Sequence, residues 1–248
     1  MTRSSTASAW LSRVRIRVSR VTPGWLLPRE LIVVLLCVDT VALLTGEVAT
    51  RGGVVRLDTA VYDTLGARSS TVADVVTELG SVQVAGTLLA FACLVAATTA
   101  RRWWPLLLAA GNSLAAAVIV LALKSAVGRT GPGLATNEDG YPGYLPSGHT
   151  AAAAVCLGTA VYLTWTAWRE RPRPVPHRAA AEVGERPRPT ADVSGRCTLI
   201  GLVVGAVVGS ATVVTGNHWV SDVLAGLAVS AFVLVLGFAT ARRWSRRR

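Results

Sequence analysis

Six long apolar runs constrain this chain more than any other feature of its sequence. A sliding window of about 19 residues finds them near residues 30–46, 80–100, 104–125, 149–168, 197–216 and 222–241. Each run is about long enough to cross a hydrocarbon core of roughly 30 Å as a helix. The sequence therefore predicts an all-α protein, an integral membrane bundle of six transmembrane helices.

The arginines predict the orientation of this bundle. They concentrate in the segments 1–29, 101–102, 169–196 and 242–248, which all lie on one face if the chain crosses the membrane six times. Lys and Arg are enriched on the cytoplasmic side of membrane proteins. We therefore expect a multi-pass protein of the cell membrane, with a domain at 30–241 and two basic tails in the cytoplasm.

Composition narrows the possible partners. The chain of 248 residues is 52% hydrophobic and carries a net charge of +11, but its arginines lie between apolar runs instead of alternating with aromatic residues, so nucleic acid is not an expected partner. The Arg/Pro-rich loop at about 169–196 is typical of a disordered cytoplasmic linker. A segment that only determines the topology is the simpler interpretation, and some affinity for anionic headgroups is the alternative. We therefore expect membrane lipids to be the partners; oligomeric state is left open.

Two local features complete the pattern. The cysteines lie in or next to apolar runs without CxxC spacing, so we expect small buried hydrophobic residues; they are Cys37, Cys93, Cys156 and Cys197. The stretch SSTVADVVTELGS predicts a short capped helix, with Thr71 and Asp74 at capping-box spacing.

Polar residues gather at span ends on the face opposite the arginines. The first group, LKSAVGRTGPG, follows the third run and contains Lys124, the only lysine of the chain. A compact ammonium suits a phosphate oxygen, whereas a lysine that only anchors the helix in the interface is the alternative.

The second group, YLPSGHT, begins the fourth span. Unpaired backbone amides at a helix start lie at the positive end of the helix dipole and bind anions, and Gly148 permits a close approach. His149 lies in the first turn, where it can donate a proton to a leaving oxygen. Taken alone, the tripeptide Ser147–His149 also fits an ordinary helix cap.

The third group, TGNHWVSD, connects the fifth and sixth spans. His218 and Asp222 are four residues apart and share a helix face. The carboxylate can bind one ring nitrogen and leave the other free to attack; a surface pair at a helix start is the alternative. Because such side chains are costly near lipid unless they are used, the three groups together predict one site on the outer face.

These residues resemble the type-2 phosphatidic acid phosphatase superfamily, the lipid phosphate phosphatases, over most of 30–240. That family is marked by Lys, six residues and Arg-Pro, by Pro-Ser-Gly-His, and by Ser-Arg, five residues, His, three residues and Asp. Here Lys124 and Pro132 match the first motif, residues 146–149 match the second, and His218 and Asp222 match the third.

The resemblance implies a membrane enzyme without metal or cofactor that removes phosphate from a lipid phosphate or diphosphate of the phosphatidic acid or polyprenyl type. It implies that His218 attacks phosphorus and forms a phosphohistidine, and that Asp222 orients it. His149 would protonate the departing lipid oxygen and then activate water. Lys124 and the amides of Ser147 and Gly148 would hold the phosphate oxygens.

Two positions depart from the family pattern. Gly131 and Thr212 stand where the motifs have arginine, and the loss of one such phosphate contact can cost on the order of 3 kcal/mol in the barrier. Arg129, two residues before Gly131, is the candidate substitute. A phosphate site weakened in this way leaves a second hypothesis open, in which the protein keeps the fold and binds a lipid phosphate without turnover.

A transporter-like bundle is the third hypothesis. It needs polar residues in the middle of the spans that line a common path, and Asp39 and Asn112 are the two clear candidates.

Overall fold

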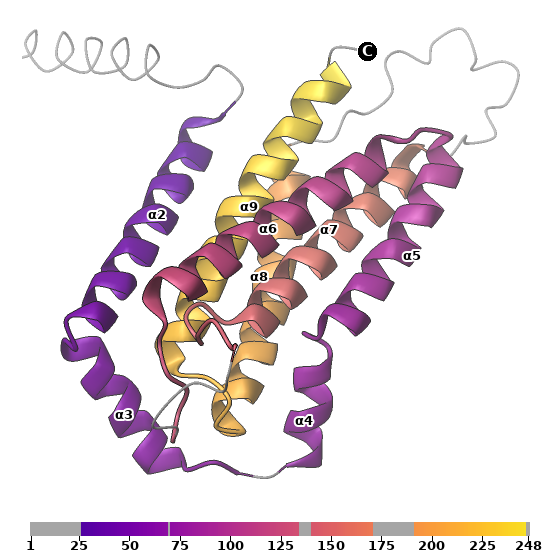
Figure 1. Ribbon diagram of the computed structural model, residues 1–248. Coiled ribbons are helices and arrows are strands. Elements are labelled where there is room, and N and C mark those ends of the chain that lie inside the picture. The colour runs from indigo at the N-terminus through magenta and orange to yellow at the C-terminus, as the bar shows by residue number, and fades with distance from the viewer. Residues whose placement is uncertain (1–25, 69, 134–139, 171–190, 247–248) are drawn as a thin grey trace, which may run out of the picture.

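A computed structural model describes residues 26–68, 70–133, 140–170 and 191–246. This part of the chain folds into helices and contains no strands. In chain order the helices are α2 (Pro28–Ala49), α3 (Gly53–Leu65), α4 (Thr71–Glu78), α5 (Val82–Ala100), α6 (Trp104–Val127), α7 (Gly148–Glu170), α8 (Ala191–Val214) and α9 (Val220–Arg246) (Figure 1).

Six of the described helices, α2 and α5 to α9, are long and apolar enough to cross a membrane, which confirms the predicted all-α membrane bundle. The hydropathy pattern misplaced some helix ends. The fifth span begins at Ala191 instead of near 197, and the sixth continues to Arg246. A helix extends beyond the hydrocarbon core into the headgroup region, where polar side chains are solvated, so apolar runs end before the helices do.

The ends of the predicted domain are therefore helical. Arg242 and Arg243, expected in a basic tail, belong to the last turns of α9. The tail at 1–25 and most of the expected Arg/Pro-rich loop lie outside the described residues.

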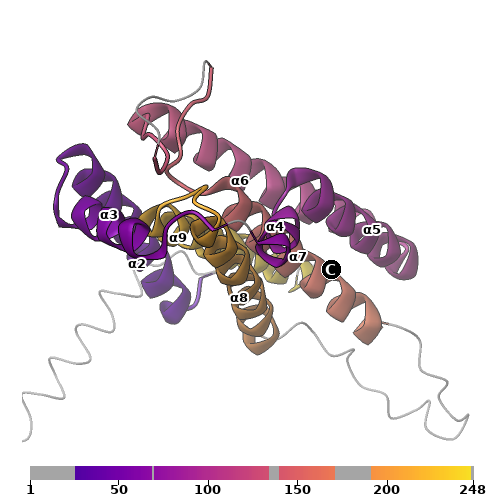
Figure 2. The ribbon, with the colours of Figure 1, turned by 90° about the horizontal axis from the view of Figure 1, so that it is seen from below.

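The spans are arranged around α7, α8 and α9. Helix α7 packs against α5, α6, α8 and α9, while α2 packs against α9 at the edge of the bundle (Figure 1). Viewed from below in Figure 2, α2 and α5 lie on opposite sides of the bundle. The short helices α3 and α4 lie at one end of the bundle, the end at which α7 and α9 begin.

Glycines bring α8 close to α7. Gly201, Gly205 and Gly209 are spaced four residues apart on α8, so they share one face. A Cβ atom on Gly201 would lie 2.6 Å from the carbonyl oxygen of Ala154 in α7. Small residues allow such close approach between helices in membranes, and this contact holds the first half of α7 against α8.

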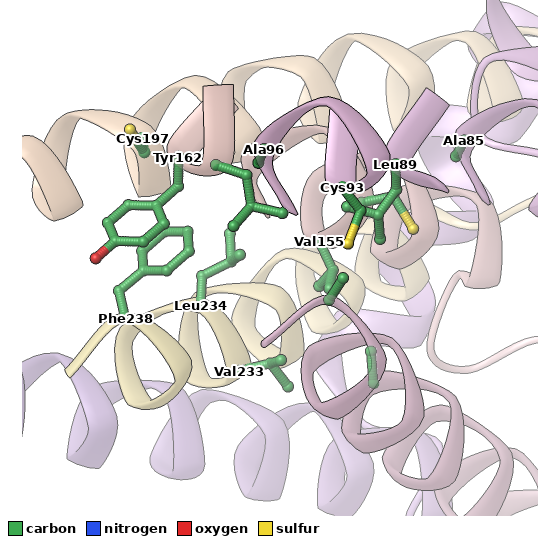
Figure 3. Packing of buried hydrophobic residues seen from close by; sticks show 14 of the residues in the cluster. Ala85, Leu89, Cys93, Ala96, Val155, Tyr162, Cys197, Val233, Leu234 and Phe238 are labelled. Carbon is green, nitrogen blue, oxygen red and sulfur yellow. The ribbon is translucent and has the colours of Figure 1, made fainter. Parts of the chain in front are cut away.

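The apolar core lies between α5, α6, α7, α8 and α9. The rings of Tyr162 and Phe238 stack at one end of this core, near Cys197, with centroids 4.2 Å apart and an interplanar angle of 15° (Figure 3). Cys93 and Cys197 lie in the same cluster. All four cysteines of the chain are buried and free, which confirms their prediction as small buried hydrophobic residues.

The two short helices differ from the sequence prediction. Helix α4 is present, but its N-cap is Ser70, whose hydroxyl oxygen accepts from the Ala73 amide at 3.4 Å, and Thr71 is the first helical residue. Ser70 and Thr71 both carry a hydroxyl that could cap the helix. Ser70 is the cap because its backbone is extended, as an N-cap requires. Helix α3 was not predicted, because this mixed segment is too polar for a hydropathy window to detect.

Candidate active site

The three predicted polar groups meet at the end of the bundle that α3 and α4 cover. Lys124 lies in the last turn of α6, His149 in the first turn of α7, and His218 just before α9. The ring centroids of His149 and His218 are 6.5 Å apart. The sequence placed these two imidazoles 69 residues apart, so their meeting is a product of the fold.

His218 and Asp222 form a buried pair at the start of α9. The Nδ1 atom of His218 lies 3.3 Å from Oδ2 of Asp222, and the same oxygen accepts from the Trp219 amide at 3.0 Å. Asp222 is completely buried and His218 is 5% exposed. A proton on Nδ1 that faces this carboxylate leaves Nε2 as the basic, nucleophilic nitrogen.

A cavity of about 560 Å³ contains the two imidazoles. Its polar end is formed by Lys124, His149 and His218. From there the cavity continues between α5, α6 and α7. Most residues that line this part have small, apolar side chains: Gly86, Ala116, Ala117, Val120, Ala152 and Val155. The cavity thus combines a group of polar side chains at the span ends with a mostly apolar lining between the spans.

Two tyrosines enclose the lysine. The Nζ atom of Lys124 donates to the Tyr141 hydroxyl at 2.8 Å and to the Gly143 carbonyl at 2.6 Å. It lies 4.7 Å from the ring centroid of Tyr141 and 5.9 Å from that of Tyr144, and the Tyr144 ring makes an edge contact with His218. No sequence pattern predicted a role for these two tyrosines; they only stand next to the second motif.

Tyr144 also explains why position 131, where the first family motif has arginine, is a glycine. A Cβ atom on Gly131 would lie 2.6 Å from Cζ of Tyr144. The aromatic ring therefore occupies the space that any larger side chain at position 131 would need. At the second departure, Thr212 is buried and its hydroxyl donates to the Gly209 carbonyl in its own helix at 2.8 Å.

Arg129 does not lie in an open phosphate site. Its Nη1 atom donates to Oδ1 of Asp222 at 2.7 Å and to the Ser221 hydroxyl at 2.6 Å, and its Nη2 atom donates to Oδ2 of Asp58 at 2.6 Å. Arg129 is 8% exposed and Asp58 is 2% exposed. The guanidinium therefore lies between two buried carboxylates, one of which is the partner of His218.

Asp58 is a member of the site that the sequence did not reveal. It lies on α3 and accepts from both the amide and the hydroxyl of Ser221, at 3.0 and 2.5 Å. These contacts attach α3 to the first turn of α9. An acidic residue in a mixed segment carries no local pattern that predicts them.

The start of α7 supplies backbone amides beside the imidazoles. The Ser147 amide donates to the Asp222 carbonyl at 2.9 Å, and the Ser147 hydroxyl accepts from the Thr150 amide at 3.3 Å as an N-cap. The amides of Gly148 and His149 have no hydrogen-bond partner among the described residues. These two amides, instead of that of Ser147, are placed to bind an anion at the positive end of the helix.

Other polar groups of the spans do not join this site. Asn112 is buried and donates to the Thr159 hydroxyl at 3.0 Å between α6 and α7, whereas Asp39 is exposed on α2. The two residues proposed for a transport path therefore lie apart. Within the part of the chain that the structure describes, no group of three or more His, Cys, Asp or Glu residues could hold a metal ion.

Comparison with known proteins gives two findings. The sequence profile of the PAP2 superfamily matches residues 102–246, a segment that contains all three motifs. The fold is similar to the crystal structure of a transmembrane PAP2 type phosphatidylglycerolphosphate phosphatase from Bacillus subtilis, with a TM-score of 0.62 and 18% identity, over 90% of this chain and 100% of that one. No curated protein matches in sequence.

Proposed function

Because this chain belongs to the PAP2 superfamily and its fold is similar to that of a transmembrane PAP2 type phosphatase, we propose that it hydrolyses a lipid phosphate or diphosphate of the phosphatidic acid or polyprenyl type. The observation that carries the proposal is the pair of imidazoles, 6.5 Å apart, at the polar end of a cavity that continues between the spans. A headgroup fits the polar end and a hydrocarbon chain fits the apolar extension.

In the first step Nε2 of His218 attacks phosphorus. The bond from phosphorus to the lipid oxygen breaks as the phosphorus–nitrogen bond forms, and His149 gives its proton to the departing oxygen. Asp222 holds the proton on Nδ1 and stabilises the positive charge that develops on the ring. Its burial and its contacts with Arg129 and the Trp219 amide fix it in this position.

In the second step His149, now neutral, removes a proton from a water molecule that attacks the phosphohistidine. The phosphorus–nitrogen bond breaks, inorganic phosphate leaves, and His149 is protonated again. The half-buried position of His149 in the cavity suits a group that must meet first the lipid oxygen and then water.

Fewer cations are available to stabilise the charge on the phosphoryl oxygens than in the family motifs, which have arginines at the positions of Gly131 and Thr212. Lys124 and the amides of Gly148 and His149 are the donors that face the site, while the charge of Arg129 is matched by Asp58 and Asp222. Preorganised donors of this kind stabilise the transition state of phosphoryl transfer. Among the residues that the structure describes, Lys124 is the one cation that lines the polar end of the cavity. This is consistent with slow turnover, and also with the second hypothesis of a lipid-phosphate binder.

The arginines support a position of the site on the outer face of the cell membrane. Among the described residues, Arg29, Arg101, Arg102, Arg169 and Arg242 lie at the ends of spans opposite the site. That end would face the cytoplasm by the positive-inside rule, together with both termini.

Phosphate release by the purified full-length chain tests the proposal. We expect release from phosphatidic acid or from a polyprenyl diphosphate in detergent micelles, and none from phosphatidylcholine, which is a phosphodiester. Saturable binding of these lipids without phosphate release would instead support the binder and reject catalysis.

A glycine-to-phenylalanine exchange tests the path of the hydrocarbon chain. Gly86 lines the cavity, and a side chain there would have open space around it. We expect Gly86→Phe to raise KM for long-chain phosphatidic acid about 10-fold, a loss of about 1.4 kcal/mol, and to leave a short-chain analogue unaffected. Gly111→Phe is the control, since Gly111 on α6 is equally open but lines another cavity; equal effects of both variants would contradict the assigned path.

A further inference from the structure

Asp39 lies in the middle of a membrane span, and no step of the proposed reaction uses it. It is the twelfth of the 22 residues of α2, so with a rise of about 1.5 Å per residue it lies roughly 15 Å from either end of the helix. Its side chain is exposed, and its carboxyl group has no hydrogen bond or ion pair among the described residues. Unlike the side chain of lysine or arginine, that of aspartate is too short to reach the headgroup region from this depth.

Helix α2 packs on the bundle with one face only. Cys37 and Leu44 are buried on the face that contacts α9. Successive residues are turned by about 100° around the helix axis, so Asp39 lies on the other face. Figure 2 shows α2 at the edge of the bundle, on the side away from α5. The carboxyl group therefore faces the bilayer.

A carboxyl group that faces hydrocarbon is costly, because the bilayer core offers no hydrogen-bond partner. Acidic residues within spans are rare for this reason. They face the interior of a bundle or a water-filled cavity, or they pair with one another. A partner for Asp39 must therefore approach α2 from the lipid side.

The residues around Asp39 form an apolar seam along α2. The seam consists of Ile32, Leu36, Asp39, Leu43 and Gly46, at alternating separations of four and three residues. This is the spacing by which two helices pack side by side along one face. The three large apolar side chains are 57 to 64% exposed. A Cβ atom on Gly46 would have nothing within 4 Å, so this position is open to a close neighbour.

A second copy of the chain fits this seam by symmetry. Copies that insert in the same orientation have parallel α2 helices, with equivalent residues at the same depth. In a twofold dimer each surface patch meets itself, so Asp39 of one copy meets Asp39 of the other. Two carboxyl groups pair when one carries a proton and donates it to an oxygen of the other. A different partner would need its own polar side chain at this depth.

We propose that the chain forms a parallel dimer in the membrane through the seam of α2, with the two Asp39 carboxyl groups hydrogen-bonded across the twofold axis. Ile32, Leu36 and Leu43 pack beside this pair, and Gly46 lets the two helices approach closely. Because α2 and α5 lie on opposite sides of the bundle (Figure 2), the interface leaves the α5 side of the catalytic cavity uncovered. The dimer is independent of whether the chain hydrolyses phosphate.

The oligomeric state of the full-length protein in phosphatidylcholine vesicles tests this proposal. Energy transfer between donor-labelled and acceptor-labelled copies, measured while the protein-to-lipid ratio is varied, gives the dimerisation constant. We expect Asp39→Leu to weaken dimerisation about 10-fold. Asp39→Asn should retain it, because two amides pair as two carboxyl groups do. Asp63→Leu, which removes an exposed acid from α3 instead, is the matched control and should have no effect.

Two further variants locate the interface on α2. Leu43→Cys should form a disulfide between copies on oxidation in vesicles, whereas Val38→Cys, which is also exposed on α2 but lies outside the seam, should not. The four native cysteines are buried, so the unchanged chain gives the background. Gly46→Leu changes no charge and has open space in a single copy. It should weaken dimerisation without lowering Tm.

Three results would overturn the proposal. A chain that stays monomeric at every protein-to-lipid ratio would reject the second copy and leave the seam to another membrane protein. Dimerisation that is unchanged in Asp39→Leu and in Gly46→Leu would place the interface on another helix. Equal crosslinking of Leu43→Cys and Val38→Cys would show random collision. Thermal unfolding in detergent checks that each variant is folded.

Discussion

Replacing His218 with glutamine is expected to abolish phosphate release from lipid phosphates, with a loss of about 10⁴-fold or more, as for removal of other catalytic nucleophiles. Glutamine is polar and of similar size, but its amide nitrogen cannot attack phosphorus. Because His218 is the proposed nucleophile, no phosphoenzyme should form. The measurement is phosphate release over time, combined with trapping of the label from a ³²P-labelled substrate on the protein.

His149→Gln is the matched comparison, because it removes the other imidazole of the pair. The variant should strongly slow phosphate transfer from a lipid phosphate, whose alkoxide leaving group needs a proton. It should slow transfer from an activated phenyl phosphate much less, because a phenolate leaves without a proton. With that ester, water attack remains slow and an acid-labile, alkali-stable phosphohistidine should accumulate. Label on His218→Gln but not on His149→Gln would reverse the two roles, and unchanged Tm values would show that both variants are folded.

The membrane topology could be predicted because its signals are local. Each span is a continuous apolar run, and each charged turn lies directly between two runs. The same is true of the three motifs, since Lys124, His149 and His218 each lie at the end of a span on the same side. Once six crossings are assumed, these residues must lie in the same leaflet, and the structure brings the imidazoles together.

The contacts that complete the site could not be predicted in this way. Asp58 meets Arg129 across 71 residues and Ser221 across 163 residues, and no periodicity or spacing connects them. Tyr144 takes the space beside Gly131 only because the loop before α7 folds back over α6. A motif comparison therefore registers a missing arginine, but not the aromatic ring that stands in its place.

The environment of Arg129 shows most clearly how a motif comparison differs from the contacts in the structure. From the sequence, Arg129 was the candidate phosphate ligand in place of the missing arginine. In the structure, its guanidinium binds Asp58 and Asp222, so we expect it to act on the proposed reaction through Asp222, the carboxylate that pairs with His218. The two roles predict different behaviour of Arg129 and Asp58 variants.

Arg129→Ala is expected to impair both stability and catalysis. Removing one partner of a buried ion pair costs about 3–5 kcal/mol, because it leaves an uncompensated buried charge, and here two carboxylates lose their counter-charge. In a chain of this size we expect Tm to fall by about 10 °C. Activity should fall by about 10²-fold in kcat, because Asp222 no longer holds His218, whereas KM should change little. Thermal unfolding and steady-state kinetics in micelles measure the two effects.

Asp58→Asn distinguishes positioning from phosphate binding. If Arg129 were a phosphate ligand held back by Asp58, this exchange would free it, and KM for the lipid phosphate would fall. If Arg129 positions Asp222, the exchange loosens the cluster, so kcat should fall without a gain in affinity. The double variant Asp58→Asn/Arg129→Ala closes the cycle. If the two residues belong to one network, the double variant should lose less kcat and less stability than the sum of the two single losses. The reason is that the second change removes a charge that the first has already left unpaired. Additive losses would mean that the two residues act separately.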